Sequence, residues 1–181
     1  MKQITTPALR LLIICVVCAF LLGISSEITK EPIAAQNIKI QQDAMSAVLP
    51  DCTYEEVSDA KLSGSVTKVN KATKDGADAG YVINCQVSSF GGPLTMMVGV
   101  DKDAKITGVR ILSHSDTPGL GAKATDPSFY DQYVGMSDGL AVEKDGGKVK
   151  AITAATITSR AVTLGASDAV QWVKDNGGAQ K

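Results

Sequence analysis

The chain has 181 residues, a length that allows one or two domains. Lys and Arg total 18 and Asp and Glu total 19, so the net charge is -1, and this balance argues against nucleic acid as a partner. Hydrophobic residues make up 44% of the chain, which excludes a disordered protein. A mean hydropathy of +0.08 excludes a protein with many membrane spans.

The N-terminal part is dominated by an unbroken run of 14 apolar residues, 11–24. Extended to 8–26, the segment has 19 residues and spans about 28 Å as a helix, close to the roughly 30 Å of a bilayer core. Arg10 then lies near the interface, which its long side chain reaches. This length favours a membrane anchor over residues 1–26, and the alternative is a secretory signal peptide cleaved near residue 25.

The four cysteines form two pairs. Cys15 and Cys18 lie inside the apolar run, where a thiol behaves as a small hydrophobic group. Cys52 and Cys85 follow in the remainder of the chain. In an extracytoplasmic domain they either form a disulfide or remain two buried free thiols, and the sequence leaves both alternatives open.

Residues 27–50 are predicted to form a helical stalk. Their apolar residues fall loosely on one side of a helix: Ile33, Ile38, Ile40, Met45, Val48 and Leu49. Pro50 marks the end of the helix, and Glu31 with Pro32 predicts a break between anchor and stalk.

The remainder, residues 51–181, is predicted to be one α/β (α+β) domain with an antiparallel sheet and flanking helices. Strands are expected over 80–87, 94–100 and 106–112, with a turn over 90–93. A short helix is expected over 126–134, with Asp126 as N-cap and Pro127 as its first residue. A hairpin is expected over 140–152, and a helix over 158–174 that ends at Asn176-Gly177-Gly178.

Two segments of this domain carry chemical information. The first, Ser113 to Gly121, follows a strand and combines hydroxyls, one carboxyl, the single histidine and two glycines that permit close approach of a flat ligand. The second, Thr153 to Ser159, places hydroxyls at the start of a helix. It is either an ordinary N-cap made by Thr158 or Ser159, or an anion site that uses the helix amides and macrodipole.

Both segments resemble one family. The stretch I-L-S-H-S-D-T-P-G-L-G-A-K resembles the loop of the FMN-binding domain in the G subunit of the Rnf complex, to which the C subunit of the sodium-pumping NADH:quinone reductase is related. The stretch A-I-T-A-A-T-I-T-S-R-A-V resembles the family's flavin attachment motif, S/T-G-A-T. The motifs occur in the family's order, and the resemblance covers nearly the whole chain, including the N-terminal helix and the linker.

The resemblance implies covalent FMN, bound through its phosphate as a phosphoester to Thr156 by a flavin transferase that uses FAD. Two residues depart from the family pattern. Ala154 replaces the usual glycine and would be strained if that position needs a positive φ. Lys150 stands where an aspartate is common and would slow the transferase if that aspartate aids recognition.

The resemblance also implies flavin contacts in both motifs. The loop from Asp116 to Gly121 would cover part of the isoalloxazine ring, with hydrogen bonds from Thr117 and apolar contact from Leu120. Thr153, Thr158 and Ser159 would contact the phosphate, Lys123 would offset its charge, and His114 would be a structural hydrogen-bonding residue rather than a metal ligand. The expected cofactor-binding set is Thr153, Ala154, Ala155, Thr156, Thr158, Ser159, His114, Asp116, Thr117, Pro118, Gly119, Leu120, Gly121 and Lys123.

As a function, the resemblance implies an electron-transfer subunit of an ion-translocating ferredoxin:NAD⁺ oxidoreductase, with no catalytic acid or base of its own. Its partners would be membrane lipid, the D, A and E subunits and, through them, B and C. The N-terminus would lie in the cytoplasm and the flavin domain outside the bacterial cell membrane. The competing hypothesis is a tethered or secreted binding domain without a cofactor.

Overall fold

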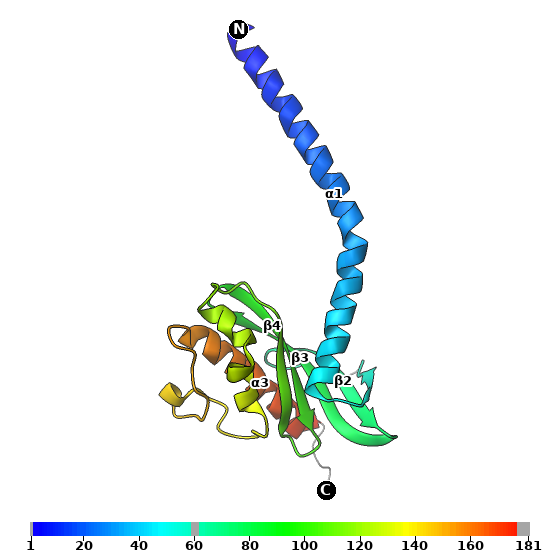
Figure 1. Ribbon diagram of the computed structural model, residues 1–181, viewed down its shortest axis with the longest axis vertical. Helices are drawn as coiled ribbons and strands as arrows, with labels where there is room; N and C mark the ends of the chain where they lie inside the picture. The colour runs from blue at the N-terminus through cyan, green and yellow to red at the C-terminus, as the bar shows by residue number, and fades with distance from the viewer. Residues whose placement is uncertain (1, 59–61, 177–181) are drawn as a thin grey trace. The chain divides into compact units, whose positions relative to one another are not determined.

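The computed structural model describes residues 2–58 and 62–176 (Figure 1). Their contacts divide the chain into two compact units, Met1–Ile40 and Gln41–Lys181. The elements in chain order are helix α1 Lys2–Val48, strands β1 Thr53–Glu56, β2 Val66–Lys74, β3 Ala77–Ser89, β4 Gly92–Asp101 and β5 Ile106–Ser113, 3₁₀-helix η1 Gly121–Thr125, helix α2 Pro127–Tyr130, 3₁₀-helices η2 Asp131–Tyr133 and η3 Glu143–Asp145, and helix α3 Thr156–Asn176.

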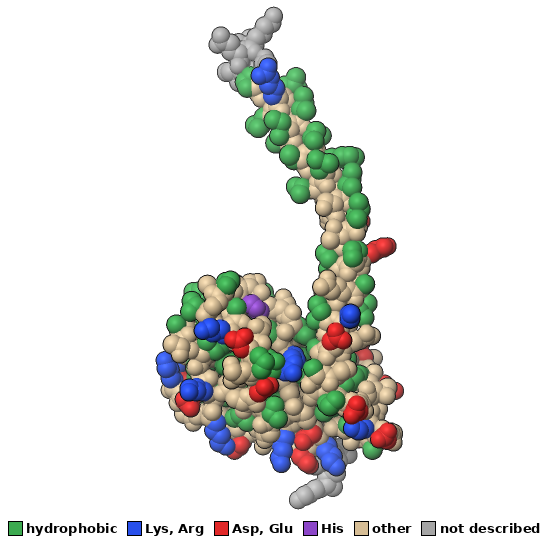
Figure 2. Space-filling model, in the orientation of Figure 1, with side chains coloured by type: hydrophobic (Ala, Val, Ile, Leu, Met, Phe, Trp, Pro, Cys, Tyr) green, Lys and Arg blue, Asp and Glu red, His purple; other side chains and the backbone are tan. Residues whose placement is uncertain are grey.

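The first unit consists of the greater part of α1. Its large apolar side chains are exposed, from 40% at Ile40 to 71% at Leu22, and Figure 2 shows hydrophobic side chains along the length of the helix. A helix that is apolar on every face requires an apolar environment. Within the described residues, Pro7–Val48 is the one helix whose length and composition suffice to cross a membrane.

The predicted break at residues 31 and 32 is wrong. Helix α1 continues through Pro32 without interruption. A proline inside a helix removes one backbone hydrogen bond, but the turns on either side keep theirs, and a long helix can absorb that loss.

The second unit contains a five-stranded sheet in the order β1-β2-β3-β4-β5, with every neighbouring pair antiparallel. The longest pair, β3 and β4, runs in continuous register from Gly80 opposite Asp101 to Ser89 opposite Gly92, so the chain reverses at Phe90 and Gly91. The predicted strands over 80–87, 94–100 and 106–112 are therefore confirmed. The predicted turn is two residues shorter, because Gly92 and Pro93 already belong to β4.

Helices cover both faces of the sheet. On one face α3 contributes Val162, Ala166, Ala169, Val170 and Val173 to the main core, as the sequence predicts (Figure 1). On the other face, a smaller core forms around Ala44, Val48 and Leu49 at the end of α1. Gly99 and Gly108 make room there, since a Cβ on either would lie within 3.0 Å of the Val48 backbone. The end of the expected stalk is thus part of the second unit.

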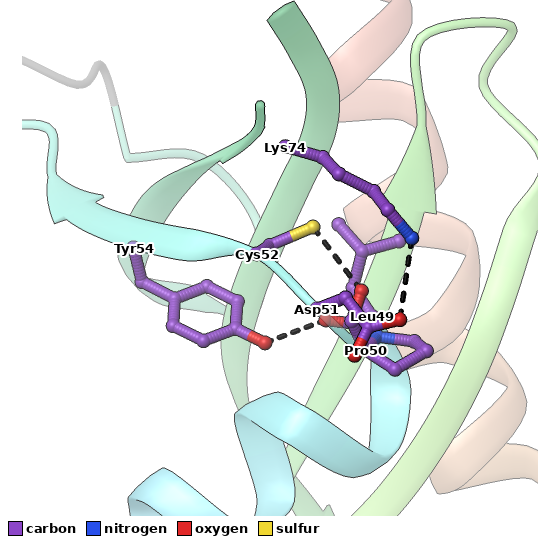
Figure 3. Close-up of polar contacts among 6 residues, drawn as sticks. All are labelled: Leu49, Pro50, Asp51, Cys52, Tyr54 and Lys74. Atoms are coloured by element: carbon purple, nitrogen blue, oxygen red, sulfur yellow. Dashed lines mark hydrogen bonds and ion pairs between the residues drawn. The ribbon is translucent and has the colours of Figure 1, made fainter. Parts of the chain in front are cut away.

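Hydrogen bonds fix the junction between α1 and β1 (Figure 3). The Tyr54 hydroxyl donates to the Leu49 carbonyl at 2.5 Å, and the Cys52 thiol donates to the Pro50 carbonyl at 3.4 Å. Burial raises the pKa of the Tyr54 hydroxyl. An ion pair of 3.3 Å joins Asp51 to Lys74 on β2. The helix ends just before Pro50, as the sequence predicts.

Two predictions for the C-terminal half are confirmed with changes. The helix expected over 126–134 is α2 followed by η2, and Asp126 occupies the N-cap position without a side-chain capping bond. The final helix begins two residues earlier than expected, at Thr156. Its expected glycine end, at 177 and 178, lies outside the described residues.

The hairpin predicted over 140–152 is wrong. Val142 and Val149 form a single parallel bridge, and the 3₁₀-helix η3 lies between them. The Gly147 amide donates to the Val142 carbonyl, and Gly146 has a φ of 83°. The glycines therefore fold the segment into a compact loop rather than a pair of antiparallel strands.

Cys52 and Cys85 are free thiols, so the disulfide alternative is wrong. Cys85 is buried on β3 in the core beneath α3, where its thiol donates to the Gly165 carbonyl at 3.4 Å. Cys52 is half-buried beside the core on the other face of the sheet. The sheet separates the two sulfurs, and burial raises the pKa of the Cys85 thiol from 9.0 to about 12.

We expect N-ethylmaleimide at pH 8 to label Cys52 in the folded protein and to leave Cys85 unmodified, because Cys85 is covered and protonated. Peptide mass spectrometry separates the two sites, and denaturant should make Cys85 reactive. A Cys52–Cys85 disulfide peptide would contradict the assignment of both cysteines as free thiols.

The buried Cys85 thiol should also make stability depend on pH. The free energy of unfolding should fall between pH 9.0 and about 12, because the thiol of the unfolded chain loses its proton at a lower pH than the thiol of the folded chain. Cys85→Ala should lack this part of the fall, which denaturant titrations at several pH values would measure.

Candidate functional site

The two informative segments of the sequence meet at one cavity of about 340 Å³. This volume lies within the range of small-molecule binding sites. The cavity is lined by Phe90, Asp116, Thr117, Leu120, Gly121, Ala154, Ala155, Thr156, Ile157 and Thr158. It therefore combines the loop after β5, the first turn of α3 and the tip of the β3–β4 hairpin.

Asp116 ties the loop after β5 to the β3–β4 hairpin. Its Oδ1 atom accepts hydrogen bonds from the Ser89 hydroxyl at 3.0 Å and from the Gly91 amide at 2.6 Å. Gly91 is required for this contact, because a Cβ there would lie 2.2 Å from the Ser115 carbonyl oxygen. The contact also places Phe90, which is 71% exposed, at the cavity.

His114 makes a hydrogen bond within the loop after β5. Its Nδ1 atom accepts a hydrogen bond of 3.3 Å from the Asp116 amide, so the ring is part of the loop that presents Asp116. His114 does not line the cavity. Among the side chains that the structure describes, no group of three or more His, Cys, Asp or Glu residues could hold a metal ion.

The segment before α3 is held by Ser159. The Ser159 hydroxyl accepts a hydrogen bond from the Ile152 amide and donates one to the Ala155 carbonyl, both at 2.9 Å. Because α3 starts at Thr156, neither Thr158 nor Ser159 is the N-cap, and that alternative is wrong. Ser159 is buried with both hydrogen bonds internal, so it supports the turn and does not reach the cavity.

Ala154 adopts the left-handed backbone conformation, with a φ of 62°. This is the strained arrangement expected if the glycine of the family motif serves a positive φ. The turn through Ala154 and Ala155 directs the chain into α3 and brings Thr156 to the cavity wall, where its side chain is half-buried.

Gly121 is the point of closest approach between the loop and α3. A Cβ on this residue would lie 2.8 Å from both Asp116 Cγ and Thr158 Oγ1. Within the described part of the chain, Asp116 Oδ2 and Thr158 Oγ1 are buried and have no hydrogen-bond partner. Buried polar atoms are normally satisfied, so these two are available to hydrogen-bond with a ligand in the cavity.

The structure divides the sequence-predicted residues into two groups. Those that line the cavity are Asp116, Thr117, Leu120, Gly121, Ala154, Ala155, Thr156 and Thr158. Those that do not are Thr153, Ser159, His114, Pro118, Gly119 and Lys123. Lys123 instead lines a neighbouring groove together with Lys150. Phe90 and Ile157 line the cavity without having been predicted, and their only sequence signal is a large apolar residue beside a turn or motif.

This geometry suits a flat ligand that carries a phosphate. The exposed apolar side chains of Phe90, Leu120 and Ile157 offer contact surface for a ring. The first turn of α3 offers free amides and the positive end of the helix dipole for an anion. The paired unsatisfied oxygens beneath the cavity offer hydrogen bonds to a polar part of the ligand. The residues present therefore fit FMN.

Comparison with known proteins agrees with this class of site. Residues 89–171 match the FMN-binding domain family. The chain is 34% identical to the G subunit of the proton-translocating ferredoxin:NAD⁺ oxidoreductase complex of Clostridium ljungdahlii, over 91% of this chain and 88% of that one. It is 31% identical to the G subunit of the ion-translocating oxidoreductase complex of Methanosarcina acetivorans, over 95% of each chain.

The chain belongs to the family of G subunits of ion-translocating oxidoreductase complexes, so the resemblance seen in the sequence is confirmed. The fold is also similar to the crystal structure of the C subunit of the Na⁺-translocating NADH-quinone reductase from Parabacteroides distasonis. That match has a TM-score of 0.52 and 28% identity, and it covers 63% of this chain and 64% of that one.

Ala154→Gly should stabilise the domain, because glycine adopts a φ of 62° without steric cost. We expect a gain of about 1 kcal/mol in the free energy of unfolding, measured by denaturant titration. The matched control is Ala161→Gly inside α3, which should lose at least about 1 kcal/mol of stability. A loss of stability on Ala154→Gly would show that the Cβ of Ala154 makes a contact worth more than the strain.

Proposed function

We propose that this chain is an electron-transfer subunit that carries covalently bound FMN in a membrane-bound ion-translocating ferredoxin:NAD⁺ oxidoreductase complex. The observation that carries the proposal is the position of Thr156. Its side chain lies in the wall of the cavity and at the first residue of α3, where apolar side chains, helix amides and unsatisfied polar atoms converge.

The attachment is a phosphoester between Thr156 Oγ1 and the phosphate of FMN. A flavin transferase supplies the flavin from FAD. The threonine oxygen bonds to the phosphorus next to the ribityl chain, the diphosphate bond of FAD breaks, AMP leaves, and the threonine proton is released. The half-buried position of Thr156 leaves its hydroxyl within reach of a donor bound outside the domain.

The phosphate takes its hydrogen bonds from the start of α3. The amides of the first turn have no partner within the helix, and the macrodipole favours a negative group at this end. Thr153 is exposed immediately before the turn and extends the polar surface available to the phosphate. Lys123 lines a neighbouring groove. Its positive charge stabilises the negative phosphate electrostatically, without direct contact.

The isoalloxazine ring lies against the apolar part of the cavity. Leu120 and Ile157 are 42% and 53% exposed and gain contact area when a ring covers them. Thr117 also lines the cavity, and its hydroxyl can form a hydrogen bond with the ring. FMN supplies the redox chemistry, and these residues orient it. No acid or base of the protein takes part.

Helix α1 holds the flavin domain at the membrane. The exposed apolar surface of its first unit is suited to lipid, and anchoring raises the effective concentration of the flavin near fixed redox partners. The relatives' names place them in multisubunit complexes. We therefore infer that the D, A and E subunits are direct or near partners, with B and C beyond them, and that the flavin domain lies on the extracytoplasmic side.

Thr156→Ala should lose the flavin completely. Co-expression with a flavin transferase should add the mass of FMN, less water, to the wild-type chain, and the denatured band should fluoresce under ultraviolet light. Thr158→Ala is the matched control and should keep the mass increment, because its hydroxyl is enclosed and not available for attachment. A dark wild-type band, or an increment that survives in Thr156→Ala, would refute the attachment site.

The N-terminal helix should remain on the mature protein. N-terminal sequencing of protein extracted from membranes should then begin near residue 1, and washing with carbonate at high pH should leave the protein in the membrane. A mature start near Ser26 would instead identify residues 1–25 as a cleaved signal peptide.

A further inference from the structure

Two buried oxygens beneath the cavity have no partner inside the described chain. Asp116 is 6% exposed and Thr158 is 0% exposed, and Asp116 Oδ2 and Thr158 Oγ1 make no hydrogen bond there. A carboxyl oxygen left in this state lowers stability more than a neutral atom does. An unsatisfied buried polar group in a folded protein has a specific cause, and because both of these residues line the cavity, a bound ligand can be that cause.

The side chains of Asp116 and Thr158 both lie next to Gly121. A Cβ on Gly121 would be 2.8 Å from Asp116 Cγ and 2.8 Å from Thr158 Oγ1. Any larger residue at Gly121 would push the two side chains apart. The glycine thus keeps a carboxyl and a hydroxyl close together at the wall of the cavity, which both residues line.

The carboxyl group is held in a defined orientation. Its other oxygen, Oδ1, accepts hydrogen bonds from the Ser89 hydroxyl and the Gly91 amide. Those two bonds use donors of the β3–β4 hairpin and leave Oδ2 as the carboxyl oxygen without a donor. Asp116 is therefore an acceptor placed next to a hydroxyl, which can donate.

We propose that Asp116 Oδ2 and Thr158 Oγ1 together bind one hydroxyl group of the ribityl chain of FMN. A hydroxyl donates one hydrogen bond and accepts others, so a single group satisfies both atoms by donating to Asp116 and accepting from Thr158. The inference rests on the proposed attachment at Thr156. It assigns Asp116 and Thr158 to the ribityl chain rather than to the ring and the phosphate.

The position along the helix supports the ribityl chain. Thr156 and Thr158 both belong to the first turn of α3, and both line the cavity. The part of FMN that lies next to a phosphate on Thr156 is the ribityl chain, and the ring is further away. The apolar surface for the ring comes from Phe90, Leu120 and Ile157, whose side chains are exposed rather than buried.

The test compares the full-length wild type with Asp116→Asn and Thr158→Val, each expressed with and without a flavin transferase. Asn keeps an acceptor for Ser89 and Gly91 but turns the Oδ2 position into a donor, and Val keeps the shape of threonine. Asp126→Asn is the matched control, since it makes the same change at an exposed carboxyl outside the cavity. Intact mass reports the attachment, and the thermal midpoint reports ligand contacts.

Without flavin, Asp116→Asn should melt about 3–6 °C above the wild type, because an unpaired buried carboxyl is lost. Attachment of FMN should raise the thermal midpoints of the wild type and of Asp126→Asn by the same amount. It should raise the midpoints of Asp116→Asn and Thr158→Val by several degrees less. Equal gains in all four proteins, with FMN present by mass, would overturn the inference. A wild type without the FMN mass would overturn the proposed function, and the inference with it.

Analogues of FAD that lack single ribityl hydroxyls separate the chain from the ring. One analogue should attach to the wild type but raise its thermal midpoint only as much as intact FMN raises that of Asp116→Asn. In Asp116→Asn, the same analogue should raise the midpoint as much as intact FMN does. If every analogue gives the full gain while Asp116→Asn shifts the visible absorption of the bound flavin, the two oxygens bind the ring edge and the inference is wrong.

Discussion

The packing of α3 against the sheet is the contact on which the site depends. The helix buries its apolar side along β3 and β4, and Gly165 sets the distance, since a Cβ there would lie 2.7 Å from Met96 Sδ. The Cys85 thiol donates a hydrogen bond to the carbonyl of the same glycine. With its middle held this closely, α3 keeps its first turn in a fixed place, and Thr156 is presented at the wall of the cavity rather than on a mobile loop.

The second constraint is the Asp116 carboxyl. It is buried and far in sequence from Ser89 and Gly91, which donate hydrogen bonds to one of its oxygens. This contact brings the loop after β5 against the β3–β4 hairpin, and Gly121 then brings it against α3. Three segments that are distant along the chain are thereby held in place before any ligand binds. This preorganisation lowers the loss of protein conformational entropy when a cofactor binds.

Much of the fold follows from local patterns, and the failures have physical reasons. The strands β3, β4 and β5 and the apolar side of α3 show clear periodicity. Strand β2 does not, because register shifts next to Val66 and Ala72 break its alternation. The region 140–152 has apolar residues on both sides of a glycine turn, but its left-handed Gly146 and the bond from Gly147 close a loop instead of a hairpin.

The sequence by itself determined the apolar N-terminal helix, the strong strands, the two motifs and, through them, the family. These are properties of neighbouring residues, and periodicity or a short motif is enough to express them. Only the tertiary structure decided that Phe90 belongs to the cavity, that Ser159 supports a turn, and that Asp116 and Thr158 each keep an oxygen without a partner. Each of these depends on contacts between segments far apart in the chain, which no local pattern encodes.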